Sequence, residues 1–162
     1  MVAMTLPIDA QIMDALAVLL RGTAATEDRS DISEVGLLIL DPSRVATEAD
    51  GVVIRLEQGD PGDGIARDAI ADTCRVQTTL PIMVTIYMPR KPGDPPNWRL
   101  LGPFYAEVHR RIMATPRTLG GLCQGIQSVG RQFPEPDSQA CWLRLLYTVT
   151  YKTAENDVTV SR

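Results

Sequence analysis

His109 is the only histidine among the 162 residues, so any mechanism of the Ser/His/Asp or Cys/His type would depend on it. The residues around it have helical spacing, and none of them forms a recognisable nucleophile motif. A lone histidine on a helix is usually a solvated side chain. We therefore predict that the chain carries no catalytic residue and is not an enzyme.

Two further groups of residues have the composition of metal ligands. The loop at residues 60–64 (DPGDG) is similar to a calcium-binding loop, but an EF-hand requires Gly at its sixth position and Glu at its twelfth. Counted from Asp60, the twelfth residue is Ala71. The three cysteines (Cys74, Cys123 and Cys141) form no CxxC pair and lie in apolar segments, which is typical of reduced thiols in a core. We expect neither a metal ion nor another cofactor.

The segment at residues 116–130 (PRTLGGLCQGIQSVG) is rich in glycine, like a phosphate-binding loop. Its spacing matches neither GxGxxG nor GxxxxGK followed by Ser or Thr. Thr115 and Pro116 are instead suited to an N-cap and a first helical position, and apolar residues then recur at helical spacing: Leu119, Leu122, Cys123, Ile126 and Val129. The pattern predicts a helix that Gly130 ends.

Three glycines lie inside this predicted helix. Gly120, Gly121 and Gly125 would each cost about 1 kcal/mol relative to Ala there. We interpret them as positions where another backbone approaches closely, either in the protein's own sheet or in a neighbouring subunit.

The elements that would position these residues follow from hydrophobic periodicity. Helical spacing predicts helices over residues 8–21 and 103–114. In the second helix, one side carries Phe104, Val108 and Ile112, and the other carries Glu107, Arg110 and Arg111. Strand alternation predicts strands over residues 51–58, 74–88 and 141–151, whereas the short apolar run at 35–40 fits a strand or a short helix.

These elements predict an α/β (α+β) fold, a single domain over residues 1–162 with a mixed, mainly antiparallel sheet flanked by helices. The last strand is expected to pair antiparallel with residues 76–88. Pro81 lies inside that partner strand and cannot donate to a ladder, which favours a sheet edge or a bend at this point.

Residues 89–103 (PRKPGDPPNWRLLGP) are predicted to form a protruding loop, because prolines leave too few backbone donors for a packed element. Trp98 beside Arg99 is a candidate contact anchor on this loop. The alternative is that Trp98 folds back onto the domain's own core. Residues 153–162 are expected to form a flexible tail or one that docks on another chain.

Charge divides the chain into two halves. Residues 1–72 hold 14 acidic and 5 basic residues, whereas residues 73–162 hold 6 acidic and 11 basic ones. The acidic total argues against a protein that clamps DNA non-specifically. The asymmetry fits either solvated surfaces or head-to-tail contacts between identical subunits. Apolar runs are too short to span a membrane, and Asp9 and Asp14 are unlike a signal peptide, so we expect a soluble intracellular product.

The order of these elements, together with several short motifs, resembles the tail terminator proteins of tailed bacteriophages, the lambda-like minor tail protein U group. The motifs are a strand with Leu-Pro followed by hydrophobic alternation (80–88), TLGGL (118–122) and a final strand that ends in YKT (151–153). The resemblance covers mainly residues 79–153. Residues 89–103 and 23–31 have no counterpart in it.

The resemblance implies a structural protein of the virion, assembled in the host cytoplasm and located at the head-proximal end of the tail. Six copies would form a ring that caps the tail tube, stops its polymerisation and joins it to the head connector. The implied partners are further copies of the chain, the tail tube protein and a head-connector or neck protein. DNA would pass through the lumen without sequence-specific binding, and no membrane is involved.

Residues suited to the subunit contacts are those with basic, aromatic or glycine character near the motifs: Trp98, Arg99, Arg110, Arg111, Arg117, Gly120, Gly121 and Gly125. A neck or head-completion ring protein is an alternative that the sequence does not separate from a tail terminator. A small-molecule-binding or enzymatic α/β domain, built around residues 60–64 and His109, is an alternative of another class.

Overall fold

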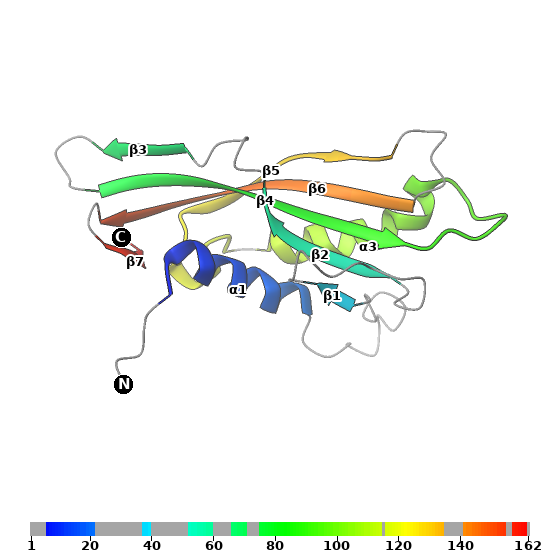
Figure 1. Ribbon diagram of the computed structural model, residues 1–162, viewed down its shortest axis with the longest axis horizontal. Coiled ribbons are helices and arrows are strands. Elements are labelled where there is room, and N and C mark those ends of the chain that lie inside the picture. The colour runs from blue at the N-terminus through cyan, green and yellow to red at the C-terminus, as the bar shows by residue number, and fades with distance from the viewer. Residues whose placement is uncertain are drawn as a thin grey trace.

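The computed structural model describes residues 6–21, 37–39, 52–59, 66–70, 75–114, 116–134, 141–154 and 157–161 (Figure 1). The loop at residues 60–64, the acidic stretch at 23–31 and Cys74 lie outside these ranges. Within them, seven strands form one sheet and two α-helices pack against it.

The first helix is α1 (Ile8–Arg21), as the periodicity predicted. Its inward side chains recur at three- and four-residue intervals and are at most 3% exposed: Ile8, Ile12, Leu16, Ala17 and Leu20. This apolar stripe faces the sheet and the second helix. Leu6, Asp14 and Val18 lie on the solvent side.

The sheet is mixed but mainly antiparallel. Its strands are β1 (Leu37–Ile39), β2 (Val53–Gln58), β3 (Ala66–Ile70), β4 (Arg75–Met88), β5 (Gly125–Gln132), β6 (Cys141–Ala154) and β7 (Asp157–Ser161). The order is β1-β2-β4-β6-β5, with β3 also paired to β4 and β7 to β6. Only the β1–β2 pair among these is parallel. The predicted fold class, a single α+β domain, is therefore confirmed.

The two longest strands, β4 and β6, form the centre of the sheet. They pair antiparallel over their full lengths, from Arg75 opposite Ala154 to Met88 opposite Cys141, as predicted. Alternate residues of β6 are buried from Cys141 to Thr153, and those of β4 from Thr78 to Ile86. Because successive side chains point to opposite faces, the residues between the buried ones form a second face of the sheet, which neither α1 nor the second described helix covers.

Pro81 is not at a sheet edge, so the edge prediction is wrong. β4 has β6 on one side, and on the other side β2 ends opposite Ile82 while β3 begins opposite Thr79. The N–H and C=O of one residue point to the same side of a strand. The carbonyl of Pro81 accepts a bond from the Gly59 N–H at 2.8 Å, on the side of this gap. The missing N–H of Pro81 would point into the same gap, so no ladder bond is lost.

The second helix, α3 (Asn97–Ile112), begins earlier than predicted. The loop before it therefore ends at Pro96, whose carbonyl accepts bonds from the N–H groups of Arg99 and Leu100. Leu101 is completely buried, and this packing outweighs the helix penalty of Pro103, which lies inside the helix on its exposed side. The prediction of a protruding loop over all of residues 89–103 is wrong for its second half.

Residues 116–130 do not form a helix, which is the largest error of the sequence analysis. A single 3-10 turn at Leu119–Gly121 is followed by β5. Gly120 and Gly121 have φ values of 71° and 95°, and even Leu119 has a positive φ of 50°. These glycines permit a left-handed turn. A Cβ at Gly120, Gly121 or Gly125 would meet nothing within 4 Å, so close packing against the protein's own sheet is not their role.

The C-terminal segment folds back on the sheet rather than extending freely. β6 continues to Ala154, and β7 pairs antiparallel with it, with Thr153 opposite Ser161. Residues 157–161 thereby contribute a strand beside α1. The expectation of a flexible or docking tail is wrong for this part of residues 153–162.

Candidate interaction site on the open face of the sheet

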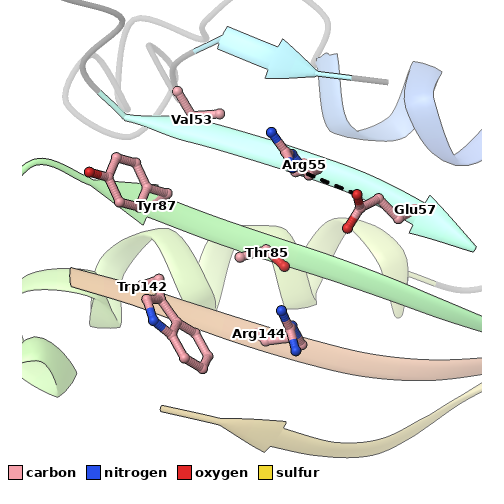
Figure 2. Close-up of a pocket in the computed structure, with 7 residues that line it drawn as sticks. All are labelled: Val53, Arg55, Glu57, Thr85, Tyr87, Trp142 and Arg144. Carbon is pink, nitrogen blue, oxygen red and sulfur yellow. Dashed lines mark ion pairs between the residues drawn. The ribbon is translucent and has the colours of Figure 1, made fainter. Parts of the chain in front are cut away.

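Both helices cover the same face of the sheet, and α1 runs roughly along the strand direction (Figure 1). The opposite face carries half-buried side chains of β2, β4 and β6, which we call the open face: Arg55, Glu57, Met83, Thr85, Tyr87, Trp142, Arg144 and Leu146. Figure 2 shows seven of the residues that line this region, projecting from the three adjacent strands. An uncovered sheet face with such side chains is a candidate interaction surface.

The register arranges these side chains in rows across the strands. In the central row, Arg55 of β2 lies opposite Thr85 of β4, Thr85 lies opposite Arg144 of β6, and Arg144 lies opposite Gln132 of β5. We call these four residues the arginine row. Directly opposed residues have Cβ atoms roughly 4.5–5.5 Å apart, so the two arginines flank the threonine.

The neighbouring rows on the open face are largely apolar. On one side, Tyr87 lies between Val53 and Trp142. On the other side, Met83 lies between Glu57 and Leu146. A basic row bordered by an aromatic row and an apolar row has the composition found in the centres of protein interfaces.

Two of the polar atoms in the arginine row have no hydrogen-bond partner among the described residues. They are Oγ1 of Thr85 and Nε of Arg144, and both are buried. The Arg144 guanidinium carbon lies 5.4 Å from the centre of the Trp142 ring, a cation–π distance. Since an unsatisfied buried donor costs about 1–3 kcal/mol, the hydrogen bonds among the described residues leave this row incompletely stabilised.

The open face is hollowed on both sides of Arg144. One pocket has a volume of about 360 Å³ and is lined by the residues of Figure 2. The other has a volume of about 550 Å³ and lies between Pro81, Leu146 and the exposed Val129 of β5. Arg144 lines both pockets.

Arg55 differs from Arg144 in its polar contacts. Its Nη1 lies 3.8 Å from Oε1 of Glu57, two residues along the same strand (Figure 2). Both side chains are partly exposed, at 28% and 23%, so this ion pair is weak. No ion pair to a carboxylate is present for Arg144 in the described part of the chain.

An ion-pair cluster around the buried Glu107 links the two helices. Glu107 is 5% exposed and accepts bonds from Arg110, at 2.8 and 3.0 Å, and from Arg111, at 2.7 Å. Hydrogen bonding to Arg110, and then to Arg111, lowers the pKa of Glu107 to about 2 against the opposing effect of burial. Arg111 also donates to the carbonyl of Leu20 at the end of α1. Glu107 is buried although it lies on the polar side of its helix, because these two arginines neutralise its charge.

His109 is half-buried rather than solvated. Its Nδ1 lies 3.1 Å from the hydroxyl of Tyr147, and its ring packs between those of Tyr105 and Tyr147. Burial raises the pKa of Tyr147 well above its usual value. A phenol that stays protonated suits a structural hydrogen bond, and no carboxylate contact orients the imidazole as in a catalytic triad within the described residues.

The predicted interface residues do not gather in one place. Trp98 and Arg99 lie at the start of α3, and Trp98 is 65% exposed, so it does not fold back onto the core. Arg110 and Arg111 lie about 18 Å further along the helix and are held by Glu107. Four others follow in the turn and the start of β5: Arg117, Gly120, Gly121 and Gly125.

The described residues contain no group of three or more His, Cys, Asp or Glu side chains that could hold a metal ion. Cys123 and Cys141 are buried free thiols, as expected, and burial raises the pKa of both. Among the described helices, none is long and apolar enough to cross a membrane.

The sequence analysis missed the arginine row. Alternation within each strand already places Arg55 and Arg144 on faces opposite to the apolar residues. What was missing was the register that sets both of them beside Thr85. No protein-family model and no curated protein matches the chain, so its own residues are the basis for the function proposed below.

Proposed function

We propose that the chain is a structural assembly protein, namely the ring-forming tail terminator that its motifs resemble. The observation that carries the proposal is the open face of the sheet, where neither of the described helices covers the apolar, aromatic and arginine side chains. Such a face is suited to a contact between subunits.

Two further features support this role. The single α+β domain with helices against a mainly antiparallel sheet has the architecture that the resemblance implies. The helices lie on one face, so the two outer surfaces of the domain differ in chemistry, as a ring of identical subunits requires. In this role the ring caps the tail tube, joins it to the head connector and lets DNA pass unread.

The test combines light scattering of the purified chain with native mass spectrometry and negative-stain imaging. We expect an oligomer of defined size, six copies on the family pattern, seen as a ring with a central hole. A chain that stays monomeric at the highest soluble concentration would contradict the proposal.

A second measurement addresses the alternative of an enzyme or small-molecule-binding domain. His109→Ala should leave the oligomer size unchanged, because His109 contacts only side chains of its own domain among the described residues. Loss of the ring in this variant, with its fold intact by circular dichroism, would show that the imidazole serves the assembly directly.

A further inference from the structure

We propose that adjacent copies of the chain meet through α1, with its solvent side docked on the open face of the next copy and Asp14 placed on the arginine row. This interface rests on the proposed ring function and specifies the contact that builds it. It pairs the two outer surfaces of the domain, one formed by a helix and one by the sheet.

The arginine row provides the basic side of the contact. Arg144 Nε and Thr85 Oγ1 are buried hydrogen-bonding atoms with no partner in the described part of the chain. The residues that carry them, Thr85 and Arg144, line the hollow in Figure 2 together with Trp142 and the Arg55–Glu57 pair. A carboxylate is the group best matched to them, because it accepts several hydrogen bonds and forms a charge-assisted pair with a guanidinium.

The solvent side of α1 provides an acidic group among apolar ones. Val18 is 66% exposed and Leu6 is 51% exposed, two of the large apolar side chains most open to solvent in the described residues. Asp14 is also exposed and lies one helical turn before Val18. We call Asp14 and Val18 the outer stripe of α1, and Leu6 lies just before the helix.

Asp14 is distinguished from the other carboxylates whose side chains the structure describes. Glu57 and Glu107 form ion pairs with arginines. The carboxylates of Asp9 and Asp94 accept hydrogen bonds from nearby backbone N–H groups. For Asp14, an exposed side chain, no ion pair or hydrogen bond to another of the described residues is present.

The spacing of the two surfaces agrees. Rows of side chains on one sheet face are about 6.8 Å apart along the strands, because every second residue points the same way. On a helix, Asp14 and Val18 are about 6 Å apart along the axis. When Asp14 lies on the arginine row, Val18 reaches the neighbouring row of Tyr87 and Trp142 or that of Met83 and Leu146.

The direction of α1 also fits. The helix runs roughly along the strands of its own sheet (Figure 1), so a neighbour added in a similar orientation presents α1 along the strands of the open face. The contact joins two different surfaces, which makes it heterologous, and a heterologous contact generates a ring when its rotation closes.

The test uses reciprocal charge reversals, Asp14→Arg and Arg144→Glu, each examined alone and as an equimolar mixture. In each variant alone, the contact faces like charges, Arg against Arg144 or Asp14 against Glu. We expect the dissociation constant of the subunit contact to rise about tenfold or more in both. In the mixture, every contact in an alternating assembly again joins opposite charges, so the oligomer should return. Recovery on mixing also shows that both variants are folded.

Arg75→Glu is the matched control, since Arg75 is exposed and lies ten residues before Thr85 in β4, about 33 Å away. It should assemble like the parent. Two results would overturn this interface while the ring function stands. One is an oligomeric parent whose assembly neither charge reversal affects, and the other is a pair of variants that do not assemble on mixing. A parent that forms only an open filament through this contact would contradict the ring instead, and a monomeric parent would contradict both.

Discussion

Neutralising Glu107 should destabilise the domain in a way that depends on pH. The pKa of this carboxyl is lowered from 4.5 to about 2, first by hydrogen bonding to Arg110 and then by Arg111, although burial opposes the shift. Each pH unit of difference between the folded and unfolded pKa is worth about 1.4 kcal/mol, so the free energy involved is about 3 kcal/mol. The Glu107 side chain is only 6% exposed, but that of Arg110 is 54% exposed, so solvent screens part of this pair and about 3 kcal/mol is an upper value.

The direction follows from the lowered pKa. The stabilisation by Glu107 is fully present above pH 4.5, where the carboxyl is ionised in both the folded and unfolded chain, and is lost as the pH falls from 4.5 towards 2. Glu107→Gln should therefore lower the free energy of unfolding by about 2–3 kcal/mol at pH 7. At pH 3 about 2 kcal/mol of the effect is already lost in the parent, and the difference should shrink to about 1 kcal/mol.

Urea unfolding of parent and variant at pH 7 and pH 3 measures both differences. One low protein concentration is used throughout, because assembly stabilises the folded state by mass action. Glu57→Gln is the control, since its ion pair with Arg55 is partly exposed and 3.8 Å long, and its effect should stay below about 1 kcal/mol at either pH. A difference for Glu107→Gln that is equal at both pH values would refute the electrostatic account of this cluster.

Other substitutions test the backbone and the core. Gly59→Ala should cost about 1–3 kcal/mol in thermal or urea unfolding, because a Cβ there would lie 2.7 Å from Cβ of Pro81. Gly121→Ala should lower the free energy of unfolding by about 1–2 kcal/mol, because the φ of Gly121 is 95°. Gly125 has open space around it and no positive φ, so Gly125→Ala should change the stability much less. Equal effects of the two substitutions would refute the left-handed turn. Burial raises the pKa of Tyr147, so its phenol should not ionise near pH 10 in the folded protein. In a titration followed by tyrosine absorbance, Tyr147→Phe should therefore show the same absorbance change near pH 10 as the parent. A smaller change in the variant would show that Tyr147 titrates normally.

The long elements of this fold could be predicted from the sequence because one period persists over many residues. The burial alternates along all 14 residues of β6 and from Thr78 to Ile86 in β4, and the three-to-four spacing of α1 continues for about four turns. A backbone with a period of two or of 3.6 can bury such a pattern on only one side. The antiparallel pairing of the two long strands follows from the same patterns.

Short segments gave weaker predictions, because their periodicity fits more than one structure. Residues 116–130 match helical spacing, but the apolar Ile126 is buried on β5, and Gly120 and Gly121 adopt positive φ in the preceding turn. The start of α3 likewise depends on the burial of Leu101, which outweighs the proline inside the helix. In both places tertiary packing overrides local preference.

The candidate site depends on contacts between residues far apart in the chain. The sequence by itself established that Arg55, Thr85 and Arg144 each point away from the apolar side of a strand. Only the folded domain showed that these three residues lie in one row. The same holds for the gap that accommodates Pro81 and for the burial of Glu107. The physical reason is that alternation within a strand is a local property of the backbone, whereas register and ion pairing depend on which strands and helices the core brings together.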